Sequence, residues 1–167
     1  PPNPKRSRVS DRFQRSRIPV LPTVLFADAS EDFRAMARDA LLEGRNVTDL
    51  RTVADGGELL AYLARAGATE GAVTPAPSLI VVDADLPGTP SGLEAIAKLK
   101  ADAATRRIPI IALGADDSAP TIDAAYDAGA NTYIVKPVTF LALVRLMKTF
   151  TAYWFETAEL PPAEEAA

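Results

Sequence analysis

Short apolar runs recur along the chain, each bounded by turn residues. The clearest is at 78–83, where five apolar or small residues lead into Asp83 between Pro77 and Pro87. An uninterrupted run of this length is typical of a strand buried on both faces of a parallel sheet. The run at 47–53 is more polar, which indicates an edge strand. Strands are expected at 23–27, 47–53, 78–83, 108–113 and 131–135.

The segments between these runs have apolar residues at helical spacing. In the first segment, Phe33, Met36 and Ala40 share one face. Ser30 can cap the start of this helix, and Gly44 can end it. Helices are expected at 31–43, 58–66, 93–100, 119–128 and 139–154. The strict alternation of strand and helix predicts an α/β protein with a doubly wound, five-stranded parallel sheet and right-handed crossovers.

The composition is that of an ordinary globular domain and narrows the possible chemistry. The chain has 167 residues, enough for one domain with its own core, and 48% are hydrophobic and 24% charged. It has no cysteine and no histidine, which excludes disulfides, thiol or imidazole catalysis and the usual zinc sites. No apolar run approaches the ~20 residues that span a bilayer. A cytoplasmic protein without membrane association is expected.

The first 22 residues differ from the rest of the chain. Six basic residues against Asp11 give residues 1–22 a net charge of +5, and the whole-chain charge of −4 then leaves −9 for the remainder. High charge, low hydrophobicity and five prolines predict that this arm is disordered. It is either a solvated tail or a basic arm for nucleic acid or for the acidic body. The expected organisation is this arm, one domain at 23–155 and a C-terminal tail at 156–167.

Charged residues follow three of the expected strands at the same end. Asp28 follows the first strand, Asp83 ends the third and Lys136 follows the fifth. In a flavodoxin-type sheet of order 2-1-3-4-5, the first and third strands are neighbours at the switch point, where open α/β sheets bind ligands. Two carboxylates there form an oxygen-rich pocket suited to a hard cation such as Mg²⁺. A lysine beside them can pair with a carboxylate or with a phosphoryl oxygen.

The motifs around these residues resemble those of response-regulator receiver domains, the chemotaxis-receiver fold of two-component signalling. The resemblance covers residues 23–154 and rests on Asp28, on LIVVDADLPG at 79–88 and on AGANTYIVKP at 128–137. It implies a receiver-like, three-layer sandwich. Shorter segments are similar to stand-alone receivers that serve phytochrome-type histidine kinases, at 101–102, 107–110 and 151–155.

The resemblance also implies a role for each residue of the site. Asp83 would accept a phosphoryl group from a kinase phosphohistidine, with Lys136 beside it. Mg²⁺ would bind the carboxylates of Asp28 and Asp83 and the main-chain carbonyl of Asp85. The Lys136–Pro137 bond would be cis. The expected protein is a single-domain response regulator, not an enzyme, without a DNA-binding domain, which signals by protein contacts and is served by a sensor histidine kinase of the phytochrome type.

Two positions depart from the family pattern. Ala27 stands where the family usually has a second acid, so weaker Mg²⁺ binding is expected. Gly114 stands where a Ser or Thr normally ends the fourth strand and binds the phosphoryl group. Without that hydroxyl, Tyr133, the family's partner residue in the switch, loses its usual trigger. The coupling of phosphorylation to a conformational change therefore stays open.

A second hypothesis is that the chain keeps the fold but acts as a phosphorylation-independent, dimeric interaction module. Ala27 and Gly114 favour this hypothesis, whereas the intact Asp28, Asp83 and Lys136 oppose it. A flavin or nucleotide carrier is disfavoured, because the turn after the first strand lacks the glycines or clustered hydroxyls that cradle phosphate.

The last expected helix, 139–154, is apolar on two sides. A helix of this kind is covered on both sides, either by the tail at 155–162 or by a second copy of the chain. A homodimer through this helix, with Leu146 near the centre of the interface, is expected. The stripe expected to face the sheet is Phe140, Leu143, Met147, Phe150 and Trp154. The stripe expected at the interface is Ala142, Leu146, Thr149 and Tyr153, with Leu141 and Val144 beside it.

Overall fold

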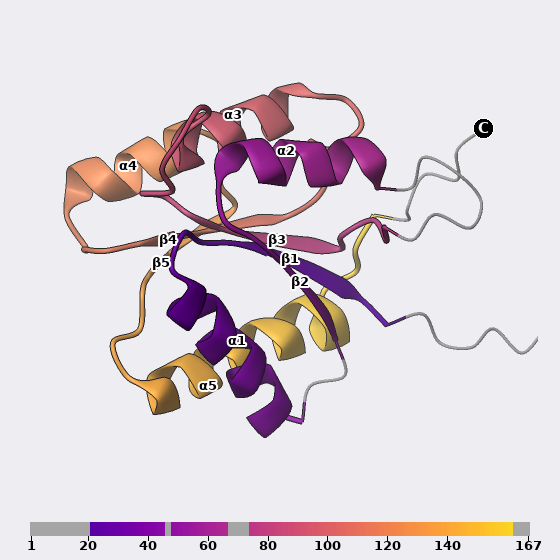
Figure 1. The fold of residues 1–167 in the computed structure, drawn as a ribbon, viewed down its shortest axis with the longest axis vertical. Helices are drawn as coiled ribbons and strands as arrows, with labels where there is room; N and C mark the ends of the chain where they lie inside the picture. Colours follow the sequence, from indigo (N-terminus) through magenta and orange to yellow (C-terminus); the bar gives the residue numbers. More distant parts are fainter. Residues whose placement is uncertain (1–20, 46–47, 67–73, 162–167) are drawn as a thin grey trace, which may run out of the picture.

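A five-stranded parallel sheet forms the centre of the protein (Figure 1). The structure, a computed structural model, describes residues 21–45, 48–66 and 74–161. The strands are β1 (Thr23–Ala27), β2 (Asp49–Val53), β3 (Leu79–Asp83), β4 (Ile110–Gly114) and β5 (Thr132–Val135). Their order is β2-β1-β3-β4-β5, as predicted. The arm at 1–20 and the tail at 162–167 lie outside the described residues, so the predicted domain boundaries stay predictions.

Helices on both faces of the sheet complete the three-layer sandwich predicted from the sequence (Figure 1). One face is covered by α2 (Gly56–Arg65), α3 (Gly92–Ala101) and α4 (Ala119–Asp127). The other face is covered by α1 (Glu31–Glu43) and α5 (Phe140–Thr151), and α5 continues as a π-helix, η1 (Ala152–Thr157). Within the described part of the chain, no helix is long and apolar enough to cross a membrane.

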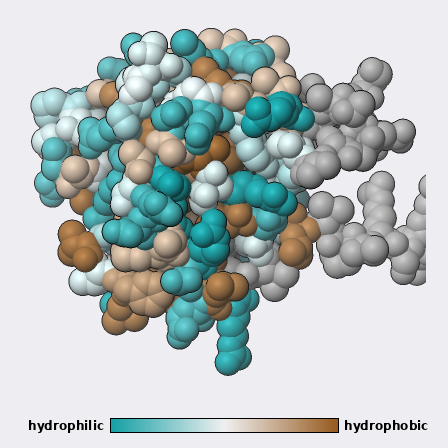
Figure 2. All heavy atoms as spheres, viewed as in Figure 1, coloured by the Kyte–Doolittle hydropathy of each residue, from teal (hydrophilic) through white to brown (hydrophobic). Residues whose placement is uncertain are grey.

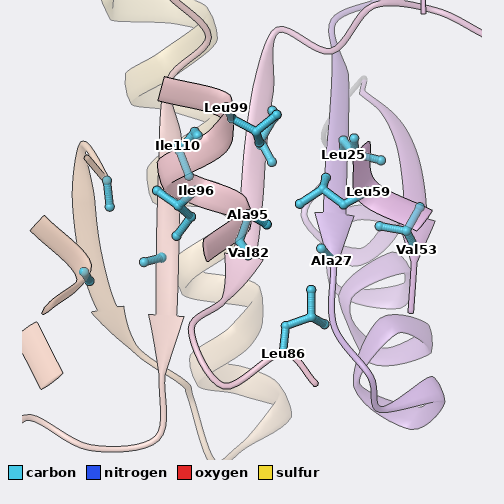
Figure 3. Close-up of a cluster of buried hydrophobic side chains, with 14 residues drawn as sticks. Leu25, Ala27, Val53, Leu59, Val82, Leu86, Ala95, Ile96, Leu99 and Ile110 are labelled. Atoms are coloured by element: carbon cyan, nitrogen blue, oxygen red, sulfur yellow. The ribbon is translucent and has the colours of Figure 1, made fainter. Parts of the chain in front are cut away.

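Side chains of β1 alternate between two cores, because successive residues of a strand point to opposite faces. Leu25 and Ala27 lie in the cluster between the sheet and α2–α3, where Figure 3 shows them near Leu59. Val24 and Phe26 belong to the cluster on the α1–α5 side. The strands β1, β3 and β4 are buried along their whole length, whereas β2 and β5 are partly exposed. The predicted edge position of β2 is confirmed.

Four of the described helices begin with a capping side chain at the carboxyl edge of the sheet, and in α5 the cap is Thr139, which accepts from Ala142 N. Ser30 caps α1 by accepting a hydrogen bond from its first turn, and Asp55 caps α2 in the same way. Ser91 and Glu94 form a reciprocal capping box at the start of α3. These caps fix the direction in which the chain leaves the edge where the charged residues lie.

Strand β4 begins two residues later than the sequence pattern predicts. Pro109 has no N–H to donate to a neighbouring strand. Ile110 N, the next donor, bonds to the side chain of Asn131 at 2.9 Å. The regular strand therefore starts at Ile110.

The last helix also differs from its predicted course. Its α-helical part ends at Thr151, whose hydroxyl donates to Met147 O at 2.7 Å. Such bonds from a threonine hydroxyl compete with the regular hydrogen bonds of a helix. Helical structure continues as η1 to Thr157, beyond the predicted end at 154.

Gly92 begins α3 directly against the backbone at the end of β3. A β-carbon on Gly92 would collide with Asp83 O and would lie 2.8 Å from Ala84 O. Backbone atoms cannot rotate away, so Gly92→Ala is expected to lower the free energy of unfolding by about 2 kcal/mol. Helix propensity alone would predict the opposite sign, a gain of roughly 0.5–1 kcal/mol. Urea unfolding measures the difference.

The matched control is Gly57→Ala in the first turn of α2. A β-carbon on Gly57 would meet the side-chain atom Asp55 Oδ1 at 3.2 Å. This variant is expected to change the free energy of unfolding by less than about 0.5 kcal/mol. Equal unfolding free energies for the two variants would show that the backbone around Gly92 has room to move.

Candidate functional site

Three charged side chains converge at the carboxyl edge of the sheet. Asp28 follows β1, Asp83 ends β3 and Lys136 follows β5. Lys136 Nζ lies 2.7 Å from Asp28 Oδ2 and 2.7 Å from Asp83 Oδ2. Because β1 and β3 are paired neighbours, the two carboxylates lie side by side, and the lysine bridges them from the edge of the sheet. The structure thus brings together the three residues that the sequence pattern places at this edge.

Asp28 is held from several directions and is 1% exposed. Its Oδ1 accepts a hydrogen bond from Ser30 N at 2.9 Å, and its carbonyl accepts one from Arg34 Nη1 at 2.6 Å. Its Oδ2 has no hydrogen-bond partner but lies 2.7 Å from Lys136 Nζ in an ion pair. A buried carboxylate oxygen in this state favours a cation nearby.

Asp83 is oriented by a donor on each of its two oxygens. Oδ1 accepts from Asp85 N at 2.9 Å, and Oδ2 accepts from Lys136 Nζ at 2.7 Å. The residue is 7% exposed, so its carboxylate is nearly buried but retains some access to solvent. This carboxylate can therefore meet a small ligand at the sheet edge.

Lys136 lies between the two carboxylates and an aromatic ring. Its Nζ is 5.0 Å from the centre of the Phe33 ring, a favourable distance for a cation–π interaction. Burial opposes the charge of Lys136, but its contacts with Asp28 and Asp83 outweigh this effect and raise its pKa above the ordinary value. Sequence reasoning missed Phe33 and Arg34 as parts of the site. Their contacts depend on how α1 packs. The only feature of the sequence that could have indicated them is their position in the first turn of α1, five and six residues after Asp28.

The expectation of a cis bond between Lys136 and Pro137 is wrong. Among the described residues, the cis peptide bond is Thr89–Pro90, in the loop before α3. The trans form is the one that X–Pro bonds favour. The lysine side chain is long enough to reach both carboxylates from a trans bond.

The donor set of the site fits a hard cation that takes few protein ligands. Asp28 Oδ2 and Asp83 Oδ2 both lie 2.7 Å from Lys136 Nζ, so the two carboxylates face the same space at the edge of the sheet. Asp85 is held next to them by its bond to Asp83. Mg²⁺ takes oxygen ligands of this kind, commonly one or two carboxylates, and keeps several waters. In the part of the chain that the structure describes, no group of three or more acidic, histidine or cysteine side chains could hold a metal.

Ala27 supplies no polar ligand to this site. It is 1% exposed, and its side chain lies in the apolar cluster with Val53 and Leu86 (Figure 3). The end of β1 therefore carries one acid, as the sequence shows. Weaker Mg²⁺ binding than in receivers with two acids stays a prediction.

Gly114 and Tyr133, the two predicted switch positions, are in direct contact. Gly114 is buried at the end of β4, and a β-carbon there would collide with the Tyr133 hydroxyl. That hydroxyl donates to Asp116 O at 2.6 Å. Burial and the nearby carboxylates of Asp116 and Asp85 raise the pKa of Tyr133. The phenol is therefore protonated at neutral pH and acts as a hydrogen-bond donor.

The residues predicted for a dimer interface differ in how much of each is exposed to solvent. Thr149 and Tyr153 are exposed, whereas Ala142 and Leu146 are half-buried. Leu146 also packs against the core on the α1–α5 side. The stripe is therefore only partly open to a second molecule.

Two expectations from the periodicity of α5 are wrong. Val144, expected beside the interface stripe, is 5% exposed, because the buried side of α5 lies between Leu143, Val144 and Met147. Phe140, expected in the core, is 43% exposed. It is the first residue of the helix, where periodicity does not tell whether a neighbouring segment covers it. Figure 2 shows hydrophobic side chains at the surface over the start of α5.

Sequence comparison finds one family pattern over most of the chain. The model of the response regulator receiver domain matches residues 24–148. Response regulator Rcp1 of Synechocystis sp. is 28% identical over 140 residues, which cover 84% of this chain and 92% of Rcp1.

Solved structures with the same fold include regulators of light signalling. The phosphorylated cyanobacterial phytochrome response regulator RcpA has a TM-score of 0.75 at 29% identity, over 85% of this chain and 99% of RcpA. Response regulator RPA3017, described in red light signalling of R. palustris, has a TM-score of 0.73 at 28% identity, over 84% of this chain and 99% of the RPA3017 chain. The Mn²⁺-bound form of Rcp1 has a TM-score of 0.71 at 24% identity, over 84% of this chain and 99% of the Rcp1 chain.

Proposed function

Because the chain belongs to the response regulator receiver domain family of two-component systems, we propose that Asp83 accepts a phosphoryl group from a sensor histidine kinase. The observation that carries this proposal is the position of Lys136 Nζ, 2.7 Å from the carboxylates of both Asp28 and Asp83. This arrangement places a fixed positive charge, Lys136, beside an oriented acid, Asp83, at the edge where α/β sheets bind ligands. The signal then passes through contacts with other proteins.

Phosphoryl transfer depends on positioning and charge more than on covalent help from the protein. A carboxylate oxygen of Asp83 attacks phosphorus, forming an O–P bond. The P–N bond to the kinase histidine breaks, and its electron pair returns to the imidazole. Lys136 offsets negative charge on the transferred group, and Asp85 N holds the second oxygen of Asp83 in place. Attack by water later releases inorganic phosphate and restores the carboxylate.

Mg²⁺ would be held by the carboxylates of Asp28 and Asp83 and by the main-chain carbonyl of Asp85. When bound, it supplies positive charge to the phosphoryl oxygens. The carboxylates of Asp28 and Asp83, which lie side by side at the ends of paired strands, support this role. The Mn²⁺-bound structure of the related Rcp1 supports a divalent cation in the same fold. Ser30 and Arg34 keep Asp28 oriented for this contact.

Acetyl phosphate tests the proposal without a kinase. The protein is incubated with acetyl phosphate and Mg²⁺, and mass spectrometry then measures added phosphoryl groups in its peptides. One added group is expected, on the peptide that contains Asp83, and a chelator is expected to suppress it. An unmodified chain, under conditions in which RcpA, whose phosphorylated form is a solved structure, is labelled, would overturn the proposal.

A kinase of the phytochrome type is the proposed donor. The support is the similarity to RcpA, a cyanobacterial phytochrome response regulator, and to RPA3017, described in red light signalling. Because a sensor kinase draws its phosphoryl group from ATP, we place the exchange in the cytoplasm.

A homodimer through α5 is also proposed. Leu141 is 60% exposed and Tyr153 is 54% exposed, and a pair that buried ~1,200–2,000 Å² in total would be stable. Leu146→Glu is expected to give monomers, because it places a charge at the centre of the interface. Light scattering at micromolar concentration measures the change.

Two further variants make the dimer test decisive. Leu146 packs partly on the core, so Leu141→Glu, a change at an exposed position of the same helix, is expected to weaken the dimer without loss of stability. Leu42→Glu on α1, at a position 71% exposed, is the control and is expected to stay dimeric. A monomeric parent protein, or dimers in both α5 variants, would show that α5 is not the interface.

The phosphorylation-independent interaction module is the alternative. It is favoured by the apolar surroundings of Ala27 and by the filled space beside Gly114. It predicts a dimer and no labelling of Asp83, so the acetyl phosphate experiment separates the two functions.

A further inference from the structure

The space beside Gly114 is filled by a side chain of the neighbouring strand. β4 and β5 are paired, with Gly114 opposite Val135, and Tyr133 comes from β5. A β-carbon on Gly114 would collide with the Tyr133 hydroxyl and ring carbon Cζ, and would lie 2.6 Å from Cε2. The phenol hydroxyl therefore occupies the position that any side chain at residue 114 would take.

This position is next to the proposed phosphoryl acceptor. Asp83 pairs with Leu113 in the register of the sheet, and Ala84 N donates to Leu113 O at 2.7 Å. Gly114 is the next residue toward the same edge, and neighbouring strands are about 4.8 Å apart. A phosphoryl group on Asp83 would extend past this edge, so the hydroxyl above Gly114 would be within its surroundings.

The same hydroxyl is bonded to the loop before α4. It donates to Asp116 O at 2.6 Å, and Ser118 N donates to Asp116 Oδ1 at 2.9 Å. One hydrogen bond thus ties β5 to the turn that leads into α4. A phosphoryl oxygen carries negative charge and is a stronger acceptor than a neutral carbonyl. A phosphoryl group nearby would compete for this donor.

We propose that the Tyr133 hydroxyl is a ligand of the phosphoryl group on Asp83 and supplies the hydroxyl that Gly114 lacks. This inference rests on the proposed function. On phosphorylation, the hydroxyl turns from Asp116 O to a phosphoryl oxygen. The loop at 115–118 then loses its tie to β5. A single side chain thereby binds the phosphoryl group and reports its presence to the start of α4.

Beryllofluoride with Mg²⁺ serves as the probe, because it mimics a phosphoryl group on a carboxylate. Calorimetry measures its affinity, amide exchange measures the loop at 115–118, and NMR of ¹³Cζ-labelled tyrosine measures the phenol. In the parent protein, the Tyr133 resonance is expected to shift on binding, and exchange at 115–118 is expected to become faster. Tyr133→Phe is expected to bind the probe about tenfold more weakly. Its loop is expected to exchange fast with or without the probe.

Two further variants separate this role from simple filling of space. Tyr126→Phe removes the hydroxyl that lies 3.4 Å from Tyr133 N and is expected to keep the parent affinity. Tyr133→Ala combined with Gly114→Ser returns a hydroxyl to the end of β4 in the vacated space. This double variant is expected to bind the probe within about threefold of the parent, whereas Tyr133→Ala alone stays weak.

The outcomes distinguish this inference from the proposed function. A parent protein that takes up neither beryllofluoride nor a phosphoryl group overturns both. If the parent binds the probe and Tyr133→Phe binds it equally well, Tyr133 only fills space and the inference is wrong. An unchanged Tyr133 resonance on probe binding overturns it as well.

Discussion

Asp83→Asn is expected to abolish uptake of a phosphoryl group from acetyl phosphate and to leave the fold intact. An amide has no charged oxygen to attack phosphorus, yet it has the shape of the carboxylate that it replaces. Asp28 and Lys136 remain as a pair of opposite charges, so the free energy of unfolding is expected to change by less than about 1 kcal/mol. Intact-mass spectrometry and urea unfolding measure the two effects.

Asp117→Asn is the matched control, because Asp117 is an exposed acid in the loop after β4. It is expected to be labelled to the same extent as the parent protein. Residual labelling of Asp83→Asn would place the acceptor on another carboxylate. Full labelling of Asp83→Asn would refute the assignment of Asp83 altogether.

Lys136→Met is expected to have the second largest effect, on both stability and phosphoryl uptake. The methionine keeps most of the side-chain volume but leaves two nearly buried carboxylates without the cation that bridges them. Removal of one partner from a buried ion pair costs about 3 kcal/mol. Urea unfolding at pH 7 measures this loss, and Mg²⁺ is expected to restore more stability to the variant than to the parent, because it supplies the missing charge.

The difference in stability between the parent and Lys136→Met is expected to depend on pH. The pKa of Lys136 is raised in the folded protein above its ordinary value of 10.5, since its contacts with Asp28 and Asp83 outweigh burial. Its stabilising contribution is therefore fully present below pH 10.5 and is lost as the pH rises through the higher folded value. The gap in stability between the parent and Lys136→Met is expected to close only in that alkaline range.

An exposed lysine of α3 supplies the control for charge alone. Lys98→Met is expected to change the free energy of unfolding by less than about 0.5 kcal/mol and to have no effect on labelling. If Lys136→Met is as stable as Lys98→Met, the ion pair with Asp28 and Asp83 contributes little to the fold. Phosphoryl uptake by Lys136→Met at the parent rate would exclude a role for the lysine in transfer.

The order of the elements and the meeting of Asp28, Asp83 and Lys136 could be predicted from the sequence. Both depend on local patterns: apolar runs of strand length, helical spacing between them, and a charged residue at the end of a run. Parallel strands then bring their carboxyl ends to one edge. No detail of side-chain packing is needed to place the three residues together.

The finer contacts of the site depend on packing between distant segments, and only the tertiary structure decided them. Phe33 approaches Lys136 because α1 packs on the same side of the sheet as the lysine side chain. Gly92 is required by the close approach of α3 to the backbone of Asp83, although helix propensity would favour alanine there. Tyr133 fills the space beside Gly114 because β5 pairs with β4. The sequence shows only that residue 114 has no hydroxyl. The fold shows that the absence of a side chain at Gly114 leaves room for the hydroxyl of Tyr133 from the next strand.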